Sequence, residues 1–304
     1  MNDLALTEPK ENALAKLSRQ TPGSLSQVGF WHGDLLLKFS TNDSGKTIIS
    51  ERQHQGPYTV QRPFYPEGHI CHSILLHPPG GLVEGDELSL RVECEEKSHC
   101  LITTPSAGKV YECQQVLAAQ KQVFLIKDKA KLEWFPQEMI LYDKSQSKLT
   151  TDIYLTGTGQ FVGWEMLCMG RPIANDHFRK GKFNQTIRLY REDKPLLIER
   201  FVLNAQSALR TQRSGLADYQ AMALYLMTGA NKESLESARQ IVSSFDESLQ
   251  KNIQLGFTLI DDVLVGRALM NQSRFAKQAF TKVWSALRLP LLNTSPINPR
   301  IWNT

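Results

Sequence analysis

Between residue 29 and about residue 201, short segments of alternating apolar and polar residues follow one another, separated by turn residues. Alternation with a period of two is typical of β-strands that bury one face. Leu88, Leu90, Val92 and Cys94, for example, share one parity, which suits a half-buried strand. The pattern predicts strands over Asp34–Phe39, Lys46–Ser50, Ile74–Leu76, Leu88–Val92, Cys100–Thr103, Val123–Ile126, Lys131–Phe135, Met139–Tyr142, Gln160–Met169 and Lys194–Leu203.

The last third of the chain has a different period. Over Lys232–Ser248 the apolar residues recur at offsets of three and four, as on one face of a helix, and Asn231 stands where an N-cap is expected. Asn271–Leu287 repeats this pattern, and Ile253–Val265 between them predicts a strand. Proline at positions 290, 296 and 299 predicts an extended, non-helical tail, which we expect Trp302 to pin to the body.

The chain contains no linker that would divide it into two domains. Residues 1–28 lack a sustained apolar face and include the turn-rich Thr21–Ser24, which predicts a mobile N-terminal arm. We therefore expect residues 29–304 to form a single domain. The fold class that fits best is mainly β, with a few helices in the C-terminal third.

Composition and charge exclude several classes of protein. The 304 residues are 41% hydrophobic and 22% charged, as in a globular chain, and 35 basic against 31 acidic residues give a net charge of +4. No block of like charge indicates nucleic-acid binding, and no apolar run approaches the ~20 residues of a membrane span. The start of the chain does not resemble a secretory signal, and five cysteines without a CxxC pair favour reduced thiols in the cytoplasm.

The sequence lacks the common signatures of catalysis. Ser40–Thr47 ends like a phosphate-binding loop, but the leading glycine is replaced by Ser40, and a hairpin turn explains the segment better. There is no GxSxG, HExxH or GxGxxG motif. We therefore expect a protein that is not an enzyme.

Potential metal ligands gather in one short segment, at His69, Cys71, His72 and His77. Imidazole and thiolate are suitable ligands for nickel, zinc or copper. On an ideal strand, however, His69 and Cys71 share one face and His72 lies on the other, so a bend or an oligomer contact would be needed to bring all four together. The alternatives are a freestanding nickel-binding or storage site, or hydrogen-bonded histidines beside a core cysteine.

Acidic residues interrupt several apolar segments, at Glu133, Glu138, Glu165 and Glu199. A buried carboxylate costs several kcal/mol unless it is paired, hydrated or bound to a metal ion. One interpretation is that these side chains face solvent or pair with arginines. The other is a hydrated internal path that lets a divalent cation pass without losing all of its water.

A set of longer motifs runs in order from about Gly29 to the C-terminus. They are Gly56–Glu67 (GPYTVQRPFYPE), Cys71-His72, Leu75–Gly81 (LLHPPGG), Gly85–Leu88, Leu101–Pro105, Leu132–Trp134, Pro136–Glu138, Gly163–Glu165, Gly170-Arg171, Pro195–Arg200 and Pro299–Trp302. Together they resemble the family of urease accessory protein D, called H in some organisms. The positions that carry this resemblance include Gln61, Arg62, Pro63, Pro78, Pro79, Gly80, Gly81, Gly85, Trp164 and Arg171.

The resemblance implies a layered, helix-like stack of short strands and a protein that catalyses no reaction itself. It implies a urease maturation chaperone that links apo-urease to the accessory proteins F and G, of which G is the GTPase, and helps to pass nickel into the urease active site. Nickel would be bound only transiently, with no permanent cofactor. By position, the resemblance implies that Asp86, Glu165 and Glu199 line the nickel path, and we add Glu138 as a further candidate.

Overall fold

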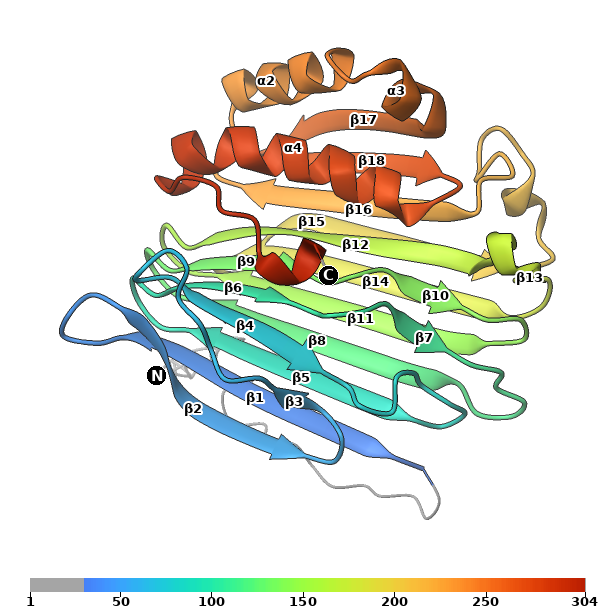
Figure 1. Cartoon of the computed structure of the whole chain (residues 1–304), viewed down its shortest axis with the longest axis horizontal. Helices are drawn as coiled ribbons and strands as arrows, with labels where there is room; N and C mark the ends of the chain where they lie inside the picture. Colours follow the sequence, from blue (N-terminus) through green and yellow to red (C-terminus); the bar gives the residue numbers. More distant parts are fainter. Residues whose placement is uncertain (1–29, 304) are drawn as a thin grey trace, which may run out of the picture.

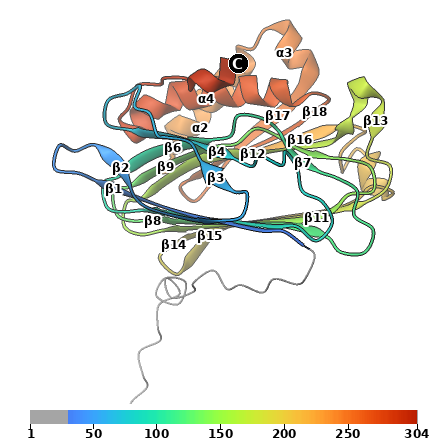
Figure 2. The same ribbon diagram turned by 60° about the horizontal axis from the view of Figure 1, so that its bottom comes forward.

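A computed structural model describes residues 30–303, so the arm predicted over residues 1–28 lies outside the described residues. The strands form two stacked sheets, between which the chain alternates (Figure 1, Figure 2). In order across the seven-stranded sheet lie β15 (Lys194–Asn204), β14 (Lys182–Arg191), β11 (Gln146–Leu155), β8 (Ala118–Ile126), β5 (Glu87–Cys94), β1 (His32–Thr41) and β2 (Thr47–Gln55).

The second sheet has 11 strands. Its main path is β17 (Ile253–Ile260), β18 (Val263–Met270), β16 (Ala221–Thr228), β12 (Gln160–Arg171), β9 (Lys131–Phe135), β6 (His99–Thr103), β4 (Cys71–Leu76) and β3 (Thr59–Val60). Three short strands attach beside it, namely β7 (Gly108–Val110), β10 (Met139–Leu141) and β13 (Asp176–His177).

Successive turns of the chain stack in parallel, as in a solenoid. β1, β5, β8, β11 and β14 pair in parallel in one sheet, and β4, β6, β9 and β12 pair in parallel in the other. The antiparallel strands β16, β18 and β17 extend the second sheet at one edge. This arrangement confirms the mainly β, layered fold class.

Three helices cover the outer face of the second sheet, at the edge formed by β16, β17 and β18 (Figure 1). They are α2 (Lys232–Ser243), α3 (Glu247–Asn252) and α4 (Ser273–Leu292), and short 3-10 turns occur at Pro172–Ala174, Ala208–Arg210 and Arg300–Asn303. Asn231 caps α2 as predicted, because its side chain accepts a hydrogen bond from the amide of Ser234. No helix in the described part of the chain is long and apolar enough to cross a membrane.

One helix and one strand that were predicted in the C-terminal third differ from the structure. The helix predicted over Lys232–Ser248 breaks after Ser243, because Asp246 caps a separate helix by accepting from the amide of Leu249. The strand predicted over Ile253–Val265 is a hairpin of two strands. Asp261 makes the turn between them with a φ of +50°.

The tail is also less extended than predicted. Pro290 lies inside α4, which continues past it only to Leu292. Arg300–Asn303 forms a 3-10 turn. The predicted anchor is confirmed, because the indole of Trp302 donates to Thr103 Oγ1 over 3.1 Å and packs against Phe135.

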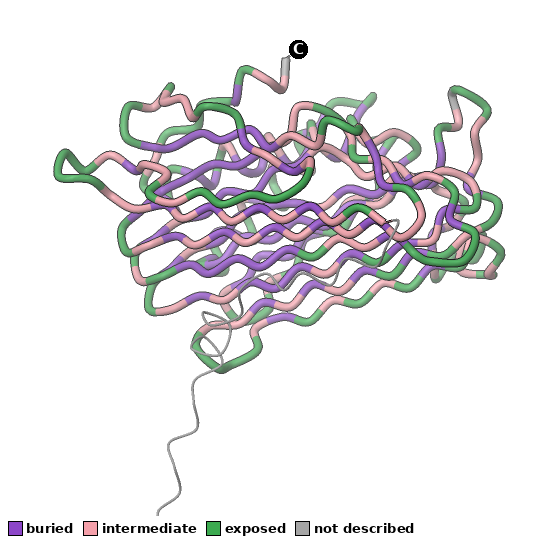
Figure 3. The backbone as a smooth tube through the Cα atoms, turned by 90° about the horizontal axis from the view of Figure 1, so that it is seen from below, coloured by how far each residue is buried: buried purple, intermediate pink, exposed green. Residues whose placement is uncertain are grey.

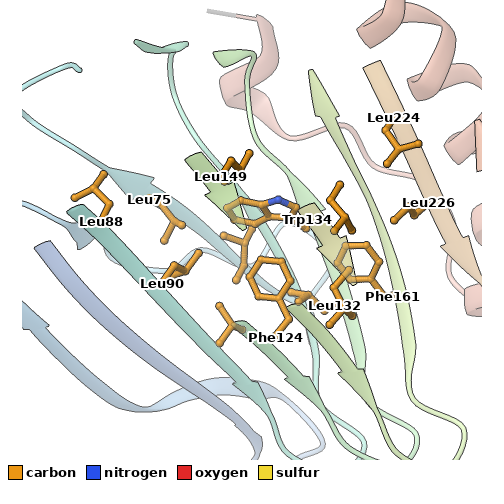
Figure 4. Packing of buried hydrophobic residues seen from close by; sticks show 14 of the residues in the cluster. Leu75, Leu88, Leu90, Phe124, Leu132, Trp134, Leu149, Phe161, Leu224 and Leu226 are labelled. Carbon is orange, nitrogen blue, oxygen red and sulfur yellow. The ribbon is translucent and has the colours of Figure 1, made fainter. Parts of the chain in front are cut away.

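Two apolar cores hold these layers together. The first lies between the sheets, where Phe124 from one sheet packs against Trp134 and Phe161 from the other (Figure 4). The second lies between the 11-stranded sheet and the helices and includes Trp164 and Phe280. Seen from below in Figure 3, buried and partly buried positions alternate along most of the strands, as expected for a sheet with one buried face.

Candidate functional site

A cavity of about 460 Å³ lies between the two sheets, at the end of the stack where the chain crosses from the 11-stranded sheet to the seven-stranded one. Segments that follow β4, β6 and β9 form its outer wall, and residues from β5, β8 and β12 form its inner wall. Its polar lining comprises Tyr58, His77, Thr104, Ser106, Lys109, Gln120, Gln122, Gln137, Glu138 and Glu165. The cavity therefore combines an apolar frame with carboxylate, amide, imidazole and hydroxyl groups and with the ammonium group of Lys109.

Glu165 is the carboxylate on the inner wall of this cavity. Glu165 and Phe161 lie on the same face of β12, so the side chain of Glu165 points toward the seven-stranded sheet. Trp164 lies on the opposite face and points toward the helices. Its Oε1 accepts a hydrogen bond from the indole of Trp134 over 3.1 Å. Burial raises the pKa of Glu165 to about 7, and the single hydrogen bond from Trp134 lowers it only in part.

This pKa predicts that Glu165→Gln becomes more stable than the wild type as pH rises. The carboxyl binds its proton up to about pH 7 in the folded chain but only to about pH 4.5 when unfolded. Stability therefore falls with rising pH across that window, by about 3 kcal/mol. Urea denaturation at pH 4.5 and pH 8 should show this gain for the glutamine variant at pH 8 only. An equal difference between variant and wild type at both pH values would contradict the assignment.

A narrow second cavity of about 10 Å³ continues inward from Glu165. Glu165 and Trp134 line both cavities, and Thr151, Ile187 and Leu224 line the inner one. Thr151 Oγ1 donates to Gln122 Oε1 over 3.1 Å, and both side chains are buried. Two buried polar side chains of the seven-stranded sheet, Thr151 and Gln122, therefore lie opposite Glu165.

Glu199 does not line this second cavity but neighbours one of its lining residues. The strand register places it beside Ile187 on β14, and it places Arg267 beside Leu224 on β16. Glu199 and Arg267 form an ion pair across the edge of the two sheets. Glu199 is partly exposed, so it is a paired surface carboxylate next to the inner cavity rather than a buried one.

Asp86 is buried at the outer end of the stack, where it organises a loop. Its two carboxylate oxygens accept from the amide of Val83 over 2.9 Å and from that of Trp31 over 3.4 Å. Burial lowers the pKa of His77, and the negative charge of Asp86 partly opposes this effect. Gly85 is required beside it, because a Cβ there would lie 2.1 Å from the ring of Phe30 and φ is +75°.

Glu138 lies between the main cavity and a neighbouring pocket of about 270 Å³. That pocket also contains Cys168, Arg171 and Ser273. Burial, together with the charge of Glu138, raises the pKa of Cys168 to about 12. Its thiol is therefore protonated at neutral pH.

The four residues of the His/Cys segment do not converge. His72 is buried and its Nε2 lies 2.6 Å from Glu67 Oε1, whereas Cys71 points into the core between the sheets. His69 is exposed, and His77 lies in the cavity wall. In the described range 30–303, no three His, Cys, Asp or Glu side chains are grouped closely enough to hold a metal ion. Strand alternation separates the ligands, as the parity argument indicated.

The remaining motif residues have structural roles or lie at the surface. Trp164 is buried and donates from its indole to the carbonyl of Pro136 over 2.9 Å, and Arg171 lies over the ring of Tyr142. Gly81 is required because a Cβ would approach the ring of Tyr111 to 2.5 Å. Gly80 has a φ of +77°. The surface or partly exposed positions are Gln61, Arg62, Pro63, Pro78 and Pro79.

The sequence left open whether Glu133 is paired, and it did not identify Arg288 as the partner in a buried ionic network beneath α4. Arg288 is fully buried, and its guanidinium contacts Glu67 Oε2 over 2.6 Å and Glu133 Oε1 over 2.7 Å. Glu133 also accepts from His99 Nε2 and from the indole of Trp284, each over 2.7 Å. Burial would raise the pKa of Glu133, but His99 and Arg288 outweigh it and hold this pKa at about 2.

Comparisons with known proteins agree with these features. A family described as UreD urease accessory protein matches residues 32–303 of the chain. A urease accessory protein UreD from Alcanivorax borkumensis is 39% identical over 289 residues, which cover 94% of this chain and 97% of that protein. The UreD of Hahella chejuensis is 36% identical over 313 residues, with 98% of both chains covered. The UreD of Enterobacter sp. strain 638 is 36% identical over 274 residues, with 90% and 96% covered. The chain therefore belongs to the UreD family of urease accessory proteins.

Proposed function

We propose that this protein is a non-catalytic scaffold of urease maturation that passes nickel through its inter-sheet cavity toward the urease active site. In this proposal it links apo-urease to the accessory protein F and to the GTPase G, which supplies the nucleotide energy. The observation that supports it best is the placement of Glu165 at the junction of two cavities in a chain of the UreD family.

The route that we propose begins at the mouth of the main cavity, near His77 and Glu138. It passes between Glu165 and the Gln122–Thr151 pair, and it ends near Glu199 at the edge of the sheets. Charged and amide oxygens along such a route replace part of the water that a divalent cation loses, which lowers the cost of taking the ion out of bulk solvent. Asp86 acts at the mouth through the loop that it holds and through its charge on His77.

Membership of the UreD family is the reason for proposing urease as the partner. The state of the cysteines supports a cellular compartment for this activity. All five cysteines are free thiols, with four buried and Cys168 partly buried. Free thiols are typical of a reducing compartment, so we place this activity in the cytoplasm. The nickel ion is cargo in this scheme, bound transiently and handed on.

The alternative is a freestanding nickel-binding or storage protein that uses His69, Cys71, His72 and His77. Their separation by strand alternation, and the pairing of His72 with Glu67, favour the transfer scaffold instead. Titration of the purified protein with nickel discriminates between the two. Tight stoichiometric binding that is lost when these four residues are replaced would favour storage.

A deletion strain tests the proposed function. In a urease-producing cell without this chain, we expect urease to accumulate folded but with little nickel, and the restored gene to return both nickel content and activity. Metal analysis and circular dichroism of the purified urease measure the two properties. Urease with its full nickel content in the deletion strain would refute the proposal.

A further inference from the structure

The end of the stack that holds the cavity mouth carries exposed apolar and basic side chains on successive turns of the chain. We call it the end surface and define it by Trp31, Val83, Val116, Leu117, Lys144, Arg179 and Lys180. The four apolar side chains are 62%, 50%, 41% and 43% exposed in the order of the sequence. Single exposed apolar residues are common, but four on adjoining loops indicate an interaction site.

Backbone hydrogen bonds place these loops side by side. The amide of Glu87, at the start of β5, donates to the carbonyl of Trp31 over 2.9 Å, which joins the first loop to the second. The amide of Cys113 donates to the carbonyl of Lys144 over 3.2 Å, and the amide of Lys144 donates to the carbonyl of Lys180 over 2.8 Å. The apolar and basic residues therefore form one continuous strip across the ends of β1, β5, β8, β11 and β14.

Three acidic side chains hold this strip in shape. Asp86 accepts from the amides of Trp31 and Val83, and Glu84 accepts from the amides of Gln115 and Val116. Asp143 accepts from the amides of Arg179 and Lys180, each over 2.8 Å. Each carboxylate thus fixes two backbone amides of adjoining loops, so the exposed side chains project from a pre-organised base.

Apolar and basic side chains occupy different halves of the end surface. Trp31, Val83, Val116 and Leu117 form its apolar half, and Lys144, Arg179 and Lys180 form its basic half. Lys144 contacts Glu112, and the carboxylate of Asp143 offsets part of the charge of Arg179. Within the described range neither Arg179 nor Lys180 forms a direct ion pair, so the three basic side chains keep a net positive charge. The basic half therefore complements an acidic partner, and the apolar half complements a partner with exposed apolar side chains.

We propose that apo-urease docks on this end surface, through a face that carries apolar side chains beside acidic ones. This inference rests on the proposed function, because urease is the partner that the family indicates. The position supports it, since Val83 adjoins Leu82 and Gly81 in the cavity wall, so a protein seated on the strip would meet the cavity mouth. Buried apolar contact would supply most of the affinity, and the basic half would set orientation and association rate.

Paired substitutions test the two halves of the surface. We expect Leu117→Asp and the double variant Arg179→Glu/Lys180→Glu each to weaken binding of purified apo-urease at least about tenfold in a surface-plasmon or pull-down titration. The charge-reversal variant should also lose most of the salt dependence of association. Thermal melts of both variants should match the wild type, because these side chains are exposed.

Matched controls come from the outer face of the seven-stranded sheet. Ile198→Asp introduces an acid at an apolar position that is 54% exposed, and Lys121→Glu reverses an exposed charge. Both controls should bind apo-urease within about twofold of the wild type.

The outcomes separate this inference from the proposed function. If the wild type does not bind apo-urease, the proposed function fails. If the wild type binds and the end-surface variants bind equally well, only the docking inference is overturned. It is also overturned if Leu117→Asp merely converts a dimer of this chain into monomers while urease binding stays unchanged.

Discussion

Arg288→Met is expected to lower the free energy of unfolding by about 3–5 kcal/mol at neutral pH. The substitution keeps most of the side-chain volume but leaves Glu67 and Glu133 buried without their cation. Uncompensated buried carboxylates are costly, and the lost contact between α4 and the loop at residues 61–70 adds to the effect. Urea denaturation monitored by tryptophan fluorescence measures the change.

The pH dependence of this effect has a defined sign. In the wild type, the pKa of Glu133 lies at about 2 instead of 4.5, so its contribution to stability is complete above about pH 4.5 and disappears as pH falls toward 2. Without Arg288 that contribution is reduced, so the difference between variant and wild type should be largest at pH 7 and shrink below pH 4.5.

Arg274→Met is the matched control, because Arg274 lies exposed on the same helix, and it should change stability by less than about 0.5 kcal/mol. Adding Glu133→Gln to Arg288→Met should recover part of the loss, since one buried charge is removed. An Arg288→Met variant that is as stable as Arg274→Met would show that the network contributes little.

The network also shows where sequence reasoning stops. Glu133 was recognisable as an acidic residue within an apolar strand, and both a paired and a hydrated environment were compatible with it. Its principal partner is 155 residues away in the sequence, on a helix whose apolar face gives no sign of a buried arginine. This pairing depends on how α4 packs on the 11-stranded sheet. The pattern of residues along the chain does not specify that packing.

Local patterns were informative wherever one face of an element is uniformly apolar. β5 alternates as predicted, and the cap at Asn231 forms as predicted. The sequence did not predict β11 and β14, because the polar residues Thr151 and Gln185 occupy inward positions and interrupt the alternation of apolar and polar residues. β16 was missed for the opposite reason, since it is apolar on both faces, with one face toward each core.

The candidate site was predictable only in part. Parity places Glu165 on the same face of its strand as Phe161, but both faces of that strand are apolar, so the sequence left open which way the carboxylate points; the structure shows that it points toward the seven-stranded sheet. The ion pair of Glu199 with Arg267 and the loop contacts of Asp86 depend on strand register between distant segments. Of the proposed path residues, Glu165 therefore offers the cleanest test, because Trp134 is its one hydrogen-bond partner within the described residues.

Glu165→Gln is expected to slow nickel-dependent activation of urease by at least about tenfold, which corresponds to ~1.4 kcal/mol on the barrier for ion transfer. The glutamine keeps the shape of the side chain but removes the negative charge that a divalent cation would meet at the junction of the two cavities. Activity and nickel content of urease, followed over time in cells that carry the variant, measure the effect.

Loss of fold does not explain such a result, because the same variant is expected to be at least as stable as the wild type at pH 8. Glu93→Gln removes a carboxylate on the outer face of β5, where Glu93 contacts Arg91, and it should activate urease normally. Asp86→Ala and Glu199→Ala should also lower activation, the first partly through its loop. If Glu165→Gln activates urease at the wild-type rate while the complex assembles, the proposed nickel path past this carboxylate is wrong.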